Sequence, residues 1–137
     1  MNLKLHEVIT LYYELNGLSR NENGSTEVIL DGILKQKMSL KVKMYLQRLN
    51  KIVTEEFKLY EENRNELVKR YGKQEGEGVY NLRDGNFEQY TKEFNELVDT
   101  GVHINVDNLW SSDLTIDNLE SIETNEYYPI LFKLIDK

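Results

Sequence analysis

The amino-acid sequence predicts a mainly α protein: a long central helix in an antiparallel helical hairpin, with short flanking helices, a minor β element and an acidic C-terminal arm. Three observations support this fold class. Apolar residues between positions 39 and 71 recur at steps of three and four, which is the period of an α-helix. No proline or glycine interrupts that stretch. A second apolar stripe follows a glycine-rich segment, a pattern typical of a chain reversal between two helices.

The length and composition indicate one domain. A chain of 137 residues supports a single core, and we divide it into an N-terminal helix and loop (1–38), the helical hairpin (39–100) and a strand, acidic arm and short helix (101–137). The absence of cysteine excludes a disulfide framework and a cysteine-based zinc site. No apolar run approaches the ~18 residues of a membrane span, and the N-terminus lacks a signal-peptide stretch. We therefore expect a soluble intracellular protein.

The first 38 residues contain one clear periodic segment. Residues 3–15 carry an apolar stripe that predicts a helix, and Gly17 provides its stop. Residues 17–26 are polar and include an Asn-Gly pair, so we expect an exposed loop. Residues 27–34 are ambiguous, because β-branched side chains favour a strand whereas the spacing of the isoleucines suits a short helix; we favour the helix.

The dominant element is a helix that begins after Ser39, a good N-cap residue, and runs to Tyr71, next to a glycine. At 1.5 Å per residue it would be roughly 50 Å long. Its distal part, residues 61–70, is almost wholly charged, and we expect it to project into solvent. Ion pairs four residues apart, such as Glu66 with Arg70, would support it there.

Residues 72–85 hold four of the eight glycines and predict the reversal. Asn86 follows as the N-cap of a shorter helix, with Gln89 at the position of a capping box. This helix carries an aromatic-rich stripe, and we expect an antiparallel hairpin to bury it against the distal half of the long helix. The two sets of residues expected to meet are Phe87, Tyr90, Phe94, Leu97 and Val98 on the short helix, and Phe57, Tyr60 and Leu67 on the long one.

The C-terminal third changes period. Residues 102–106 alternate between apolar and polar side chains, which predicts a short strand. A strand must pair, and the candidates are residues 27–30, residues 78–82 or a strand of another chain. Residues 107–126 read as an acidic extended arm. Pro129 is expected to open a final helix, docked by four aliphatic residues: Ile130, Leu131, Leu134 and Ile135.

Charge is divided along the chain. Residues 1–72 carry twelve basic and ten acidic side chains, whereas residues 73–137 carry five and fourteen. Residues 35–51 hold six basic side chains and no acid, and residues 84–126 hold eleven acids and one base. We expect these two segments to pack near one another in the fold. The basic stretch could alternatively bind nucleic acid, but the net charge of −7 and the lack of a recognition motif argue against it.

From about residue 38 onward the chain resembles a family of small proteins encoded by tailed phages and prophages of low-GC Gram-positive bacteria, a domain of unknown function. The resemblance rests on SLKVKMYLQRLNK (39–51), EENRNELVKRYGKQ (61–74), NFEQYTKEFNELVDTGVHINV (86–106) and LWSSDL (109–114). These motifs are structural and include no catalytic residue. The C-terminal tail, residues 122–137, is longer and more aromatic than the family pattern. The resemblance implies a phage accessory or structural protein with no assigned activity.

Residues suited to catalysis or metal binding are few. His6 lies on the flank of the first helix, where a structural role is expected. His103, Asn105 and Asp107 would share one strand face, but a transition-metal site normally needs three or four ligands, and nothing nearby completes the set. The acidic pairs of the long helix do not face each other across a cleft. We therefore expect no enzyme activity, no metal and no cofactor.

The sequence thus favours a binding protein. We expect a phage-encoded interaction module in the host-cell cytoplasm that inhibits or modulates a host protein of defence or replication. The alternative is a virion or assembly component of the head, neck or tail, which a ring-like homo-oligomer would favour; nucleic-acid binding and a small metal-dependent enzyme are the least favoured functions. Aromatic anchors and steering acids of the C-terminal part are the predicted partner-binding residues, although we expect at least half of the aromatics to be buried in the monomer. They are Trp110, Asp113, Asp117, Glu120, Tyr127, Tyr128 and Phe132.

Overall fold

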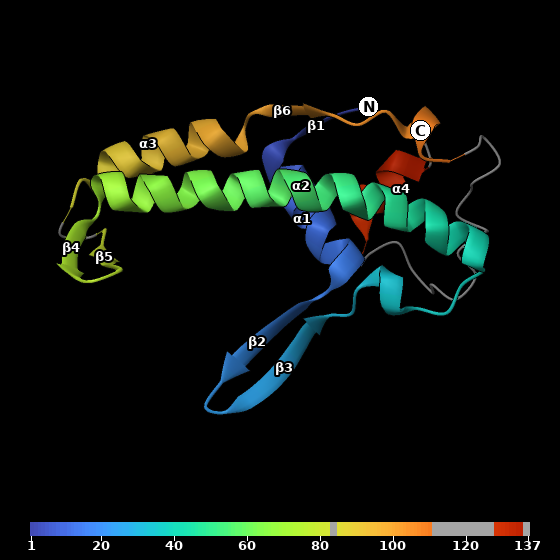
Figure 1. Ribbon diagram of the computed structural model, residues 1–137, viewed down its shortest axis with the longest axis horizontal. Coiled ribbons are helices and arrows are strands. Elements are labelled where there is room, and N and C mark those ends of the chain that lie inside the picture. Colours follow the sequence, from blue (N-terminus) through green and yellow to red (C-terminus); the bar gives the residue numbers. More distant parts are fainter. Residues whose placement is uncertain (83–84, 111–127, 136–137) are drawn as a thin grey trace.

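The structure, a computed structural model, describes residues 1–82, 85–110 and 128–135. Within these residues the chain forms four α-helices, which confirms a mainly α protein around a long central helix (Figure 1). Six short strands pair two by two in antiparallel fashion. The helices are α1 (Leu5–Asn16), α2 (Leu40–Tyr71), α3 (Phe87–Val98) and α4 (Pro129–Ile135), and the strand pairs are β1 (Asn2–Lys4) with β6 (Gly101–His103), β2 (Leu18–Glu22) with β3 (Ser25–Leu30), and β4 (Lys73–Gly76) with β5 (Val79–Asn81).

The long helix α2 has the predicted ends. The Ser39 hydroxyl accepts a hydrogen bond from the Val42 N–H at 3.3 Å, as an N-cap should. At the other end the Gly72 N–H donates to the Val68 carbonyl at 2.8 Å. Its buried side chains follow one stripe at steps of three and four, apart from one longer interval, and they are Val42, Leu46, Leu49, Val53, Phe57 and Leu67.

The core lies where α1 crosses the middle of α2 and where α4 docks beside both. Leu11 and Leu15 of α1 and Leu131 of α4 are fully buried there. The expected docking of the C-terminal helix is confirmed, since Pro129 opens it and its aliphatic side chains enter the core. An ion pair of 3.0 Å between Lys133 Nζ and a carboxylate oxygen of Glu7 adds a polar link from α4 to α1.

One carboxyl group is buried in this core. Glu14 of α1 is only 1% exposed, and its oxygens accept hydrogen bonds from the N–H groups of Leu131 at 2.9 Å and Ile130 at 3.3 Å. Those N–H groups lie in the first turn of α4, where no backbone acceptor is available. Burial raises the pKa of Glu14 to about 7, although the two hydrogen bonds favour the ionised form. Glu14 therefore links α1 to α4 through a carboxyl group whose pKa lies near neutrality.

The prediction that residues 17–26 form a loop is wrong. β2 and β3 form a hairpin that projects away from the helices (Figure 1). Asn23 (φ 52°) and Gly24 (φ 79°) both adopt positive φ, which is the two-residue turn that suits the twist of paired strands. The strands lack alternating apolar residues because neither face of the hairpin packs on the core.

The helix favoured over residues 27–34 is also wrong. Residues up to Leu30 belong to β3, and the short 3₁₀ helix η1 (Ile33–Lys35) follows. Gly32 explains the break: a Cβ on it would lie 2.4 Å from the Asn16 carbonyl carbon, so the chain crosses the end of α1 in backbone contact.

The strand predicted over 102–106 forms only in part, and it has none of the expected partners. β6 pairs with β1, with Val102 opposite Leu3, at the very start of the chain. The first helix consequently begins at Leu5 and not at residue 3. Ile104 and Val106 continue inward as buried residues, and Val106 opens the second 3₁₀ helix, η2 (Val106–Asn108).

α3 lies along the distal half of α2, but it does not bury its stripe as predicted (Figure 1). Its Asn86 cap is confirmed, since the side chain accepts from the Gln89 N–H at 3.2 Å. No residue of α3 is buried. Phe57 of α2, expected against α3, instead stacks on Tyr12 of α1 with ring centroids 3.9 Å apart. The predicted aromatic contact between α2 and α3 is confirmed for Tyr60, whose ring centroid lies 6.4 Å from that of Phe94 in a T-shaped arrangement.

The charged segments behave in part as predicted. Residues 61–70 are mostly exposed, and Arg70 Nη2 pairs with Glu66 Oε1 at 3.2 Å. The 72–85 reversal is present and contains β4 and β5. Most of the acidic arm, residues 111–126, lies outside the described residues. Within the described part of the 84–126 segment, the Leu109 carbonyl accepts a hydrogen bond from Arg48 Nη1 of the 35–51 segment at 3.3 Å.

Candidate partner-binding groove

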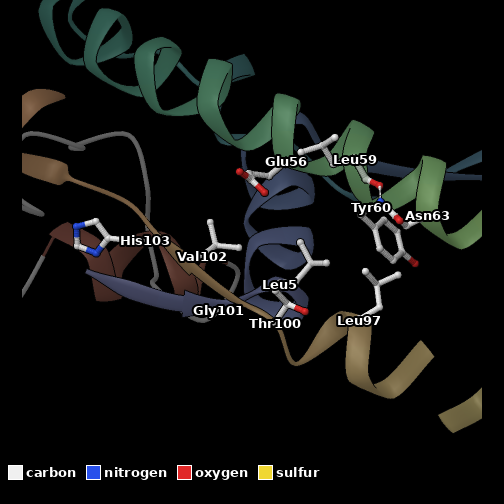
Figure 2. Close-up of a pocket in the computed structure, with 10 residues that line it drawn as sticks. All are labelled: Leu5, Glu56, Leu59, Tyr60, Asn63, Leu97, Thr100, Gly101, Val102 and His103. Carbon is white, nitrogen blue, oxygen red and sulfur yellow. Dashed lines mark hydrogen bonds between the residues drawn. The ribbon is translucent and has the colours of Figure 1, made fainter. Parts of the chain in front are cut away.

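Two adjoining hollows lie on one side of α2, between it and the segment that runs from α3 into β6. Their volumes are about 320 and 300 Å³, and both are lined by Asn63, Leu97 and Thr100. The hollows adjoin at these three residues, and we call the two together the α2–α3 groove. Figure 2 shows the larger hollow, to which α1 contributes Leu5, α2 contributes Tyr60 and α3 contributes Leu97.

Helical spacing explains why α2 supplies one wall. The lining residues of α2 recur every three or four positions, so their side chains form a stripe beside the buried one. The same rule places Glu93, Glu96, Leu97 and Thr100 on the facing side of α3 and its C-terminal end. The α2 residues of this stripe are Glu56, Leu59, Tyr60, Asn63, Glu66, Leu67 and Arg70.

The groove has an apolar inside and a charged outside. Buried or half-buried side chains of four elements line its inner part: Leu5, Tyr60, Leu67, Leu97 and Val102. Leu59 lies at its edge and is 53% exposed, so much of its side chain faces solvent. An apolar surface bordered by charge is the composition of a protein-binding site.

The charges around the groove are mainly negative. Four carboxylates, Glu56, Glu66, Glu93 and Glu96, line it together with one guanidinium, Arg70. Arg70 already lies 3.2 Å from Glu66 and 3.8 Å from Glu93, so it is shared between two acids of opposite walls. The side chains of the groove therefore present net negative charge to solvent.

One carboxylate oxygen in the groove is left without a donor. Glu93 Oε2 is buried and accepts no hydrogen bond from the described residues. A buried acceptor without a donor costs about 1–3 kcal/mol, and more when it is charged. The same carboxyl group has the Tyr71 hydroxyl as a neighbour, and a hydrogen bond with Glu93 raises the pKa of Tyr71.

The polar groups of the groove do not assemble into catalytic pairs. The Thr100 hydroxyl donates to the Glu96 carbonyl at 3.1 Å, and His103 Nδ1 lies 2.7 Å from Asn2 Oδ1. Burial raises the pKa of the Tyr60 hydroxyl, which disfavours a phenolate nucleophile. Across residues 1–82, 85–110 and 128–135, no group of three His, Asp or Glu side chains is placed to hold a metal ion.

Three of the partner-binding residues predicted from sequence lie in the core and not in the groove. Trp110, Tyr128 and Phe132 are buried in the core, which confirms that at least half of the four named aromatics are internal. The Tyr128 hydroxyl donates to the Asp31 carbonyl at 2.8 Å, so even its polar end is used within the chain. The structure thus brings these three together as core residues. The remaining predicted positions, Asp113, Asp117, Glu120 and Tyr127, lie outside the described residues.

Sequence reasoning missed the groove itself. Its one local signal is Leu59, an apolar residue outside the main stripe of α2. The facing wall depends on how α3 lies on α2, which no local pattern specifies. Other exposed apolar residues, such as Leu40 at 84% and Val28 at 57%, line neither hollow of the groove.

Comparisons with protein-family models, curated proteins and solved structures find no significant match for this chain. None of the helices in the described part of the chain has the length and apolar character needed to cross a membrane. The function proposed below rests on the geometry of the groove.

Proposed function

We propose that this protein is a non-enzymatic interaction module that binds another protein through the α2–α3 groove. The observation that carries the proposal is a groove with apolar inner residues, an acidic border and no assembled catalytic groups among the described residues. In this proposal α2 and α3 act together as an antiparallel hairpin whose incompletely buried faces form the contact surface. Interfaces of this kind combine an apolar centre with a charged rim.

The resemblance to small phage and prophage proteins suggests the setting. We propose that the protein is phage-encoded, acts in the host-cell cytoplasm and inhibits or modulates a host protein of defence or replication. Its acids would speed encounter with a basic partner and suppress acidic ones. A virion or assembly component remains the alternative within the same fold.

A capture experiment with matched variants tests this function. Tagged parent protein is incubated with host lysate at low and moderate salt, beside Leu59→Asp and Leu40→Asp. Both leucines are exposed and lie on α2, but only Leu59 lines the groove. We expect one host protein to be captured by the parent and by Leu40→Asp, and lost with Leu59→Asp.

Circular dichroism of all three proteins shows whether they remain folded. If no host protein is captured, and the chain is found stoichiometrically in purified particles, the inhibitor proposal is wrong and the virion-component alternative replaces it. Capture that Leu59→Asp leaves unchanged would instead place the binding surface outside the groove.

A further inference from the structure

The shape of the groove indicates an elongated occupant. Along α2 its lining runs from Glu56 to Arg70, which is about 21 Å at 1.5 Å per residue. The two hollows centre near Tyr60 and Leu67, seven residues or about 10 Å apart. A compact small molecule would fill one hollow and leave the other empty. Two side chains on the same face of a helix, seven residues apart, would reach both.

The walls of the groove favour a helix over an extended strand. The three-residue strand β6 lines part of the larger hollow. The longer walls are α2 and α3, which satisfy their backbone hydrogen bonds internally and so offer only side chains along the groove. A strand would bring a row of backbone donors and acceptors with no partners there, whereas a helix satisfies its own. An amphipathic helix in an apolar groove is a recurring mode of protein recognition.

The charges specify the flanks of that helix. Glu56 and Glu66 border the groove on the α2 side, and Glu93 and Glu96 border it on the α3 side. A lysine or arginine on each flank of the inserted helix would therefore face an acid. The buried Glu93 Oε2, which lacks a donor among the described residues, would gain one from such a cation.

We propose that the α2–α3 groove receives a cationic amphipathic helix of the partner protein, with apolar residues at i and i+7 in the two hollows and basic residues on both flanks. This deepens the proposed function and depends on it. The chain's own residues 111–127 are a poor occupant, because they contain five acids and no base. A second copy is a competing occupant, since the start of α2 combines exposed Leu40 with several lysines.

A designed peptide provides the direct probe. An 18-residue fluorescent helix with leucines in one stripe and lysines on both flanks is titrated into the full chain and followed by anisotropy. The control peptide has the same composition with the leucines dispersed. We expect the dispersed peptide to bind about tenfold more weakly or worse, because it cannot fill both hollows.

Charge-reversal variants locate the site. The double variant Glu56→Lys and Glu96→Lys changes one acid on each wall. Neither side chain forms an ion pair with another residue of the described part of the chain. Its matched control, Glu61→Lys with Glu62→Lys, makes the same change of net charge at exposed positions outside the groove. We expect the first to weaken peptide binding at least tenfold and to flatten its salt dependence, and the second to stay within about threefold.

Three results would overturn this inference. The first is equal binding of both peptides, or equal loss in both double variants, since either means attraction by net charge alone. The second is self-association of the parent in sedimentation that Leu59→Asp and Leu40→Asp both abolish, which would make a second copy the occupant. Capture of a host protein that Leu59→Asp abolishes, without binding of the designed peptide, would reject the helix while leaving the proposed function in place.

Discussion

α1 and α3 are both twelve residues long and both pack against α2, yet they differ completely in burial. α1 buries five residues, Leu5, Val8, Leu11, Glu14 and Leu15, whereas α3 buries none. The cause is the number of neighbours. α1 lies between α2, α4 and η1, so its apolar stripe is covered from several sides. α3 contacts α2 at one end of the molecule and, less extensively, α1, so its stripe is at most half-buried within the described residues (Figure 1).

This difference separates stability from binding. Apolar area that is already buried contributes to folding, about 25 cal/mol per Å². Area that remains half-exposed is still available to a partner. The middle of α2, beside α1 and α4, should therefore determine the stability of the fold, while its distal end beside α3 provides the binding surface.

The largest expected effect comes from replacing one leucine of α1 and one leucine of α3 by alanine. Leu11→Ala removes a fully buried side chain and should lower the free energy of unfolding by about 3 kcal/mol. Leu97→Ala, at a half-buried position of α3, should lower it by about 1 kcal/mol. Urea denaturation followed by circular dichroism measures both. Equal losses would show that α3 is as much a part of the core as α1.

The next effect is a dependence on pH that originates in α1. The pKa of Glu14 is about 7 in the folded protein, whereas the ordinary value for a glutamate is 4.5. Between these two pH values the folded protein therefore binds a proton that the unfolded chain does not. The free energy of unfolding should therefore rise as pH falls from 8 to 5, by at most about 3 kcal/mol. Glu14→Gln should remove this rise. The exposed control Glu62→Gln should retain it, and a rise that survives in Glu14→Gln would assign it to another group.

A smaller effect distinguishes the two helix caps. Ser39→Ala removes the N-cap of α2 and should cost about 1 kcal/mol of global stability. Asn86→Ala removes the equivalent cap of α3. Since α3 contributes little to the core, this change should speed amide exchange within residues 87–98 and alter the global unfolding transition by less than ~0.5 kcal/mol. A full loss of about 1 kcal/mol with Asn86→Ala would contradict the separation of the two regions.

The smallest effect concerns the exposed ion pair of the distal half. Glu66→Gln breaks the pair with Arg70, whose side chains are both at least half exposed. Exposed pairs of this spacing contribute about 0.3–0.5 kcal/mol at most. Thermal unfolding should therefore be almost unchanged, whereas binding in the groove should weaken because a bordering acid is lost. A large drop in thermal stability would mean that the distal half is held by its charges.

Local signals made part of this fold predictable. Ser39, Asn86 and Pro129 each mark a helix start by their own chemistry, and the structure has helices starting next to each of them. The pairing of β1 with β6 was not predictable, because it joins three-residue strands about a hundred positions apart. The β2–β3 hairpin was not predicted, because it is exposed on both faces and its sequence therefore lacks the alternation of apolar and polar residues that usually indicates a strand.

The candidate site was less predictable than the fold. Aromatic residues near the C-terminus suggested interface anchors, but a small core needs the same kind of side chain. Trp110, Tyr128 and Phe132 are buried in that core. The groove is made by two walls that meet only in three dimensions. Its α2 stripe could be seen in the sequence as a helix face, but not as one side of a groove.

The most direct test of the central claim is hydrogen exchange of the full chain, alone and in complex with the host protein captured by the parent. In the free protein we expect amides of α3 to exchange faster than those of α1, because α3 has no buried residue. On binding, protection should increase in α3 and in the distal half of α2 and remain unchanged in α1 and in the β2–β3 hairpin. New protection confined to the hairpin or to the start of α2, with α3 unaffected, would contradict the assignment of the α2–α3 groove as the binding surface.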